Sequence, residues 1–142
     1  MLISEIMTKD VVTISPDASL KELGSVFKEK RISGIPVVGE YGNIVGIVTL
    51  TDMLRILSRI YEWGELRERT AGLNLSKKRQ EEKLKSKVRD VMTKEVFTVA
   101  KNETVEYVVG VMLTKNIHTF PVIEEGKLIG VVGKRDLIYA CF

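Results

Sequence analysis

Two aspartates occupy matching places where the last helical segment of each half of the chain begins. Asp52 follows Thr51, and this pair is expected to cap a helix that starts near Met53. Asp136 holds the equivalent place in the second half. A carboxylate accepts two hydroxyl donors at once, and negative charge is favourable at a helix N-terminus. Capping is the role expected from these residues alone, and ligand binding is compatible with it.

Two cations, Lys134 and Arg135, stand directly before Asp136. Positive charge at the start of a helix opposes the helix dipole, so this placement is locally unfavourable. Such a conflict favours a second use for the side chains, and phosphate binding suits two adjacent cations. The alternative is that both side chains point into water. His118 is the only histidine, and a lone histidine is more often structural than a ligand.

Catalytic constellations are missing from the sequence. Cys141 and His118 fall in different elements, so they form no nucleophile–base pair. There is no serine-centred nucleophile elbow, no phosphate-binding glycine loop and no cluster of metal ligands. The sequence therefore predicts a binding protein rather than an enzyme, with no metal and no required cofactor.

The elements that must position these residues come twice. Ile6-Met7-Thr8-Lys9 recurs as Val91-Met92-Thr93-Lys94, an offset of 85 residues. The same offset carries Pro36 to Pro121, and after one residue is lost near Tyr41 it becomes 84. Matches in this order, with one gap at a turn, indicate an internal repeat.

Each repeat is expected to run strand–helix–strand–strand–helix. In the first repeat the strands are 11–14, 35–38 and 44–48, joined by a helix from Ala18 to Lys30 that Ser15-Pro16-Asp17 starts. Neither repeat alone builds a large core, so the two should pack together as one α+β module. The predicted boundaries are 1–58 for repeat 1, 59–87 for a charged, partly helical linker and 88–142 for repeat 2.

The linker region carries the net positive charge of the chain. Between Arg59 and Asp90 there are ten basic and six acidic residues. Ser76 to Lys85 is predicted to form an exposed helix, and Lys77 to Arg89 carries seven basic residues against two acids, enough for contacts with nucleic acid phosphates. A solvated helix with Glu–Lys pairs is the favoured interpretation, and the segment lacks an aromatic platform for bases.

The bulk composition is typical of a globular protein outside the membrane. Apolar residues make up 44% and charged residues 29% of the chain. No apolar run approaches the ~20 residues of a membrane span, and no secretory signal is seen. A single cysteine, Cys141, forms no internal disulfide. A cytoplasmic location is therefore expected.

The repeated motifs resemble those of CBS domains, the small modules named after cystathionine β-synthase. The resemblance lies in the openings Ile6-Met7-Thr8 and Val91-Met92-Thr93 and in the strands Gly34 to Val38 and Thr119 to Ile123. The closing segments 46–52 and 130–136 share it. It covers both repeats, and implies a βαββα fold for each, packed about a pseudo-twofold axis with two clefts.

The resemblance also implies adenosyl ligands, such as AMP, ADP, ATP or S-adenosylmethionine. It places the ribose on the aspartate of each closing motif and the adenine against main chain of the strands. Gly133 replaces the threonine of the motif in repeat 2, which removes one hydroxyl. The ligand-binding residues expected on this basis are Ile14, Ser15, Gly34, Ile35, Pro36, Thr49, Thr51, Asp52, His118, Thr119, Phe120, Pro121, Lys134, Arg135 and Asp136.

The sequence thus predicts a stand-alone ligand-sensing regulatory module that binds an adenosyl ligand in at least the first-repeat cleft and acts on an unidentified protein partner. A homodimer is expected. A nucleic-acid binder and a purely structural dimerisation module are the alternatives. Candidates for the dimer interface or the core are the apolar residues of the terminal helices: Met53, Leu54, Ile56, Leu57, Leu137, Ile138, Tyr139 and Phe142.

Overall fold

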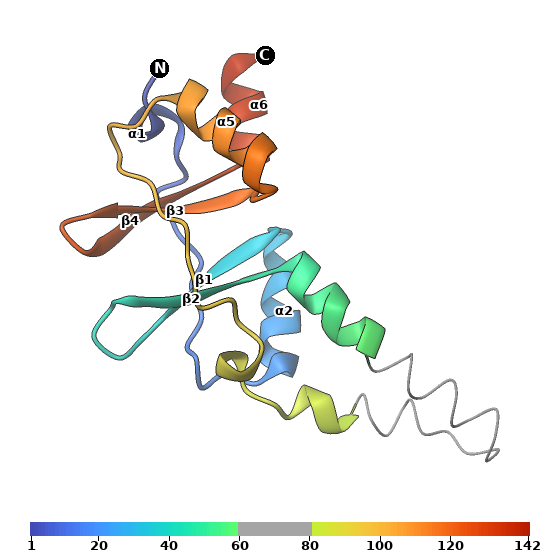
Figure 1. Ribbon diagram of the computed structural model, residues 1–142. Coiled ribbons are helices and arrows are strands. Elements are labelled where there is room, and N and C mark those ends of the chain that lie inside the picture. The colour runs from blue at the N-terminus through green and yellow to red at the C-terminus, as the bar shows by residue number, and fades with distance from the viewer. Residues whose placement is uncertain (60–80) are drawn as a thin grey trace.

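The computed structural model describes residues 1–59 and 81–142. It confirms an α+β fold (Figure 1). Residues 50–59 and 81–84 are also helical. Of the predicted 76–85 helix, residues 76–80 lie outside the described residues, and Lys85 is in a turn. The named elements are α1 (Ile3–Ile6), α2 (Leu20–Lys30), β1 (Gly34–Val38), β2 (Ile44–Thr49), η1 (Val88–Asp90), α5 (Val105–Lys115), β3 (Thr119–Glu124), β4 (Lys127–Gly133) and α6 (Lys134–Cys141).

Each repeat contains one antiparallel hairpin. β1 pairs with β2 so that Pro36 faces Ile47, and β3 pairs with β4 so that Pro121 faces Val131. The turns use a glycine in the left-handed region, with φ of 80° at Gly42 and 77° at the equivalent glycine of repeat 2. Glycine reaches this region without steric cost. The predicted hairpins are confirmed.

The predicted first strands, 11–14 and 96–99, are reduced to one bridging residue each. Ile14 donates from its N to the Pro36 carbonyl at 3.1 Å and accepts from the Val38 N at 2.9 Å. Continuing this parallel ladder backward would need an N–H from Pro36, which proline lacks. Pro121 limits the pairing of Val99 in the same way.

α2 begins two residues later than the predicted start at Ala18, and α5 begins at Val105. Ser19, rather than Ser15-Pro16-Asp17, caps α2, and its hydroxyl accepts from the Glu22 N at 3.1 Å. Thr104 caps α5 through the Tyr107 N at 3.1 Å. In each helix the hydroxyl of the capping residue satisfies a backbone N–H of the first turn that has no partner within the helix.

The module has two apolar cores, and each takes its first helical segment from the other repeat. Val88 in η1 is fully buried in the core of α2, β1 and β2. Ile3 in α1 is fully buried in the core of α5, β3 and β4, and α1 contacts α6. Figure 1 shows the chain starting beside α6 and then crossing to the half that holds α2. The two repeats are therefore joined by an exchange of segments.

The exchanged segments are fixed by the repeated Met-Thr motif. Thr8 and Val131 exchange two backbone hydrogen bonds of 2.8 and 2.9 Å, and Thr93 and Ile47 exchange two of 2.9 Å. In each case the preceding methionine packs on a glycine of the strand: a Cβ built on Gly46 would lie 2.6 Å from the Met92 Sδ. The Met-Thr motif of each repeat thus binds a strand of the other repeat, and we call this pair of contacts the Met-Thr clasp.

Gly46→Ala is expected to lower the free energy of unfolding by about 1–3 kcal/mol, the range for overpacking a core. The added methyl would meet both Met92 and, at 3.0 Å, the backbone carbonyl oxygen of Thr93. Gly24→Ala in α2 is the matched control, because its Cβ meets nothing within 4 Å. Alanine there should stabilise the helix by about 0.5–1 kcal/mol. Urea unfolding measures the free energy of unfolding of both variants, which should fall for Gly46→Ala and rise for Gly24→Ala. Equal changes in the two variants would contradict the close packing of Met92 on Gly46.

The apolar residues of the terminal helices divide into two groups. Ile56 and Leu137 are buried in the two cores, and Met53 packs against the first. Leu54, Leu57, Ile138, Tyr139 and Phe142 are exposed. The homodimer stays a prediction. Within residues 1–59 and 81–142, no helix combines the length and apolar character that crossing a membrane demands.

Candidate functional site

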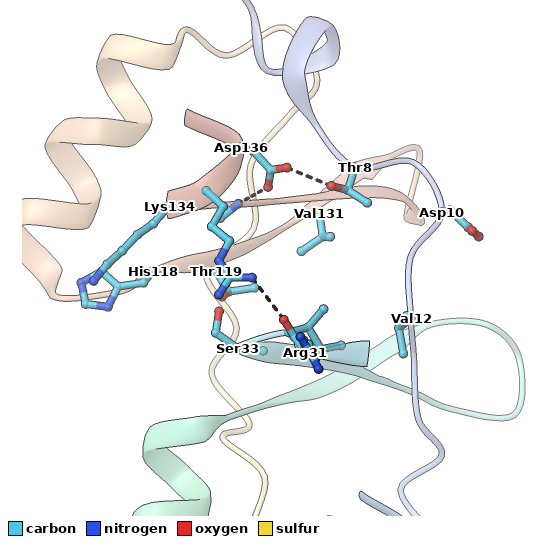
Figure 2. A pocket seen from close by; sticks show the side chains of 14 residues that line it. Thr8, Asp10, Val12, Arg31, Ser33, His118, Thr119, Val131, Lys134 and Asp136 are labelled. Carbon is cyan, nitrogen blue, oxygen red and sulfur yellow. Dashed lines mark hydrogen bonds between the residues drawn. The ribbon is translucent and has the colours of Figure 1, made fainter. Parts of the chain in front are cut away.

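A cleft of about 410 Å³ lies between the two repeats, and Figure 2 shows the side chains that line it. The N-terminal segment, the end of α2, the start of β3, and the β4–α6 junction all contribute to it. We call it the Asp136 cleft. Its lining residues are Thr8, Asp10, Val12, Arg31, Ile32, Ser33, Gly34, His118, Thr119, Val131, Gly133, Lys134, Arg135 and Asp136.

Asp136 stands in the first turn of α6, where its carboxylate does two structural tasks. Its Oδ2 accepts from the Gly133 N at 2.7 Å, which caps the helix, and its Oδ1 accepts from the Thr8 hydroxyl at 2.9 Å. A carboxylate offers about four acceptor sites. The half-buried Asp136 therefore keeps roughly two sites for hydroxyl donors of a ligand.

Three cations line the cleft, and two come from the first turn of α6. Lys134 and Arg135 are exposed, as is Arg31 at the end of α2. The Arg135 Nη1 donates to the Arg31 carbonyl oxygen at 3.3 Å, a contact that spans the two repeats. Arg31 ends α2 with a positive φ of 51°. Lys134 and Arg135 thus both line the cleft, and their predicted role in phosphate binding stays a prediction.

His118 lies just before β3, within reach of the Lys134 charge. Burial is the main cause that lowers the pKa of His118 below the ordinary 6.5, and the positive charge of Lys134 lowers it further. Both causes favour the neutral imidazole in the free protein.

The equivalent carboxylate of repeat 1, Asp52, is more buried and makes more hydrogen bonds within the protein than Asp136 does. The sequence placed Thr51 and Asp52 at the cap of a helix from Met53, but the helix covers 50–59 and Thr49 caps it. The Asp52 Oδ2 accepts from the Thr49 N at 2.8 Å and the Thr49 hydroxyl at 3.1 Å. Its Oδ1 accepts from Arg55 at 3.3 Å and from Thr93 at 3.4 Å. Asp52 is only 8% exposed, and four hydrogen bonds already occupy its oxygens.

The structure brings together six of the expected ligand-binding residues. These are Gly34, His118, Thr119, Lys134, Arg135 and Asp136. Five others are buried, which leaves them main-chain contacts at most: Ile14, Ile35, Pro36, Phe120 and Pro121. Phe120 packs edge-on against Phe97 in the second core, with centroids 5.6 Å apart. Ser15 and Thr51 are exposed, and their ligand roles stay predictions together with those of Thr49 and Asp52.

Eight lining residues were not among the ligand-binding residues predicted from the sequence. They are Thr8, Asp10, Val12, Arg31, Ile32, Ser33, Val131 and Gly133. Thr8 carried a usable signal, because the Met-Thr motif recurs at an offset of 85. Arg31 also precedes the strand entrance that holds Gly34, and its counterpart Asn116 has the same positive φ, 54°.

The repeat relation shows how unequal the two halves are. The cations Arg31, Lys134 and Arg135 correspond to Asn116, Leu50 and Thr51. None of these counterparts is charged. The cationic residues are therefore gathered on the Asp136 side, next to a carboxylate with free acceptor sites. Such a pairing suits a ligand that carries a diol and a phosphate.

Comparisons with known sequences agree with the architecture. The family model of the CBS domain matches residues 3–59 and 88–142. The chain is 35% identical to an uncharacterized protein, MJ1426, of Methanocaldococcus jannaschii, over 99% of this chain and 90% of that protein. It is 31% identical to inosine-5'-monophosphate dehydrogenase of the same organism, over 94% of this chain but 22% of the enzyme.

Solved structures give the same result at the level of the fold. The CBS domain pair of protein MJ0100, in complex with 5'-methylthioadenosine and S-adenosyl-L-methionine, has a TM-score of 0.74 at 23% identity, over 99% of this chain and 94% of that one. CBSX2 in complex with AMP has a TM-score of 0.74 at 24% identity, over 98% and 94%. These matches confirm the family resemblance and the fold class predicted from the sequence.

Proposed function

This chain belongs to the CBS-domain family and carries two CBS domains in tandem, and from that premise we propose that it is a ligand-sensing regulatory module whose Asp136 cleft binds a phosphorylated adenosine. The observation that carries the proposal is the composition of that cleft, which three cations line together with the carboxylate of Asp136. AMP, ADP and ATP are the ligands with matching chemistry. Catalysis is not part of the proposed role.

The arrangement of the cleft supports one orientation of the nucleotide. In Figure 2, His118 and Lys134 stand at one end, Asp136 and Thr8 above the middle, and Val12 and Asp10 at the other end. The ribose hydroxyls would donate to Asp136, the phosphates would lie toward Lys134 and Arg135, and the base would lie against Val12 and Val131. Apolar contact suits the base, and charge-assisted bonds suit the phosphates.

Two structural relatives support the ligand class, because each was solved with an adenosine derivative bound. The MJ0100 domain pair was solved with 5'-methylthioadenosine and S-adenosyl-L-methionine, and CBSX2 with AMP. The three cations of the Asp136 cleft favour the second kind of ligand here, because the sulfonium of S-adenosylmethionine is itself positively charged. Ligand binding beside Asp52 remains a prediction from the sequence.

The regulatory mechanism proposed is a population shift between arrangements of the two repeats. The cleft is lined from both repeats, and the bond from Arg135 to the Arg31 carbonyl spans them. A ligand that binds one arrangement more tightly than the other changes their balance. The surface presented to a partner protein would then change with nucleotide concentration.

The nucleic-acid alternative is weakened by the basic residues that the structure describes at the end of the linker. Arg89 forms an ion pair with Asp17, and the Lys87 Nζ lies 3.7 Å from the same carboxylate. Arg89, as the first cause, and Lys87 lower the pKa of Asp17. These two cations are partly engaged within the protein, which leaves less charge for nucleic acid phosphates.

A thermal-shift panel tests the proposal with AMP, ADP, ATP, adenosine, S-adenosylmethionine and NAD. A ligand at 100 times its Kd should add about 2.7 kcal/mol of stability, because it binds only the folded state. We expect the phosphorylated adenosines to raise the Tm most. The result should not change when DNA is added.

The matched variant replaces each cation by its counterpart from the other half: Arg31→Asn, Lys134→Leu and Arg135→Thr. Each new residue already occupies the equivalent backbone position, including the positive φ of Asn116. This variant should lose the Tm response to AMP and ATP and keep any response to adenosine. A panel without response in the unmodified protein would overturn the proposed function and favour a structural or nucleic-acid role.

A further inference from the structure

His118 holds the one titratable imidazole of the chain, and it lies in the cationic end of the Asp136 cleft. Figure 2 shows its ring beside the side chain of Lys134. Histidine is the side chain whose ordinary pKa places its change of charge near neutral pH. His118 is therefore the group in the described cleft that can adjust its own charge to that of a ligand.

Charged groups reach the surroundings of His118 from several elements. The first turn of α6 brings two cations and one acid, the end of α2 one cation, and the N-terminal segment one acid. Lys115, three residues before His118 in the chain, stands over the ring of Phe97, with its Nζ 5.8 Å from the centroid. The groups that line the cleft are Lys134, Arg135, Asp136, Arg31 and Asp10.

These surroundings hold the ring neutral when the cleft contains no anion. Burial and the charge of Lys134 both lower the pKa of His118. A phosphoryl group carries a charge of about −1.5 to −2 at pH 7. Placed between Lys134 and the imidazole, it would offset the repulsion from the ammonium and favour the imidazolium, which donates from both ring nitrogens.

On the premise of the proposed function, we propose that His118 couples phosphate binding in the Asp136 cleft to proton uptake, so that a phosphorylated ligand is held more tightly in mildly acidic than in mildly alkaline solution. The sign follows from linkage. A group that is neutral in the free protein and protonated in the complex takes up a proton on binding. Falling pH then favours the complex, until the free protein is protonated as well.

The proposed coupling predicts that the affinity for a charged ligand depends on pH differently from the affinity for an uncharged one. An uncharged adenosine offers nothing to stabilise the imidazolium, so its affinity should be independent of pH or fall slightly in acid. AMP is an awkward probe, because its own second ionisation lies near pH 6. Adenosine 5′-sulfate keeps a single negative charge across this range and isolates the protein's contribution.

Proton NMR gives the direct measurement, because the imidazole signals of a protein with one histidine need no assignment. Titrations between about pH 5 and 8.5 are made with the free protein, with adenosine and with adenosine 5′-sulfate. We expect the sulfate ester to raise the pKa of His118 by about one unit, and adenosine to leave it unchanged or lower it. A one-unit rise means tenfold tighter binding to the protonated protein.

Calorimetry of the His118→Gln variant completes the test. Glutamine keeps a hydrogen-bonding side chain and removes the titration, so adenosine 5′-sulfate should bind with an affinity that no longer depends on pH. Binding of the ester with an unmoved His118 pKa, or a pH dependence that survives in His118→Gln, overturns the coupling and leaves the nucleotide site intact. If neither AMP nor the ester binds at any pH, the proposed function fails, and the coupling fails with it.

Discussion

Ile3→Ala should lower the free energy of unfolding by about 2–5 kcal/mol, the range for truncating a fully buried isoleucine, although Ile3 lies in a helix of only four residues. Its side chain is completely buried in the second core. Its N donates to the Glu103 carbonyl oxygen at 2.9 Å, and the Ser4 N donates to that of Lys101 at 2.9 Å. The segment is thus bound through both backbone and side chain to the repeat that lies far from it in sequence.

Urea unfolding followed by circular dichroism measures the loss. Leu2→Ala is the matched control, because Leu2 is the neighbouring residue and is 39% exposed. A surface change of this kind should stay within about 0.5 kcal/mol. A loss for Ile3→Ala as small as that for Leu2→Ala would show that α1 is not part of the second core.

The exchange of segments between the two repeats also affects how cooperatively the module unfolds. Ile3 and Val88 occupy equivalent positions, and each completes the core of the other repeat. A substitution in either segment therefore destabilises the core of the other repeat. We expect the Ile3→Ala protein to unfold in one transition, as small domains with a shared core usually do.

Local features of the fold were predictable because local chemistry specifies them. Gly42 and its counterpart mark the hairpin turns, and the alternation around Pro36 and Pro121 marks the central strands. The extent of the first strands was not predictable from β-branched residues alone, since the missing N–H of Pro36 acts across the sheet on Val12. The predicted start of α2 lay two residues too early, because the prediction rested on Ser15-Pro16-Asp17, whereas Ser19 caps the helix.

The exchange of segments was beyond the sequence for a different reason. The apolar residues Ile3, Ile6 and Met7 indicate burial, but periodicity does not say which partner covers them. Only the docking of Met7 on Gly130 and of Met92 on Gly46 reveals that the partners are crossed. Long-range pairing of this kind follows from three-dimensional packing, not from local propensity.

The types of residue in the candidate site were predicted more fully than the repeat in which the site lies. Lys134, Arg135 and Asp136 were expected to act together, and the structure gathers them in one cleft. The emphasis on the first repeat rested on its complete Thr49-to-Asp52 motif. In the structure that motif is satisfied internally, because Thr49 and Asp52 cap each other. Arg31 was missed because it approaches from the end of a helix in the other repeat.

Asp136→Asn should weaken AMP binding by about 10- to 150-fold, equivalent to about 1.5–3 kcal/mol for hydrogen bonds to a charged group. Asparagine is nearly the same shape and keeps one oxygen to accept from the Gly133 N. It replaces the second acceptor by a donor, so the paired ribose hydroxyls lose their common partner. Asp10→Asn is the matched control, since it removes the same charge from an exposed position at the edge of the cleft.

A comparison of AMP with 2′-deoxy-AMP shows whether the lost affinity comes from the ribose. The unmodified protein should prefer AMP, because only AMP offers both hydroxyls to the carboxylate. Asp136→Asn should remove most of that preference, whereas a merely structural effect of the substitution would weaken both nucleotides equally and preserve their ratio. The Asp10→Asn protein should keep the ratio. If Asp136→Asn retains both its affinity and its preference for AMP, the ribose does not lie on Asp136, and Asp52, despite its four internal hydrogen bonds, becomes the carboxylate to test.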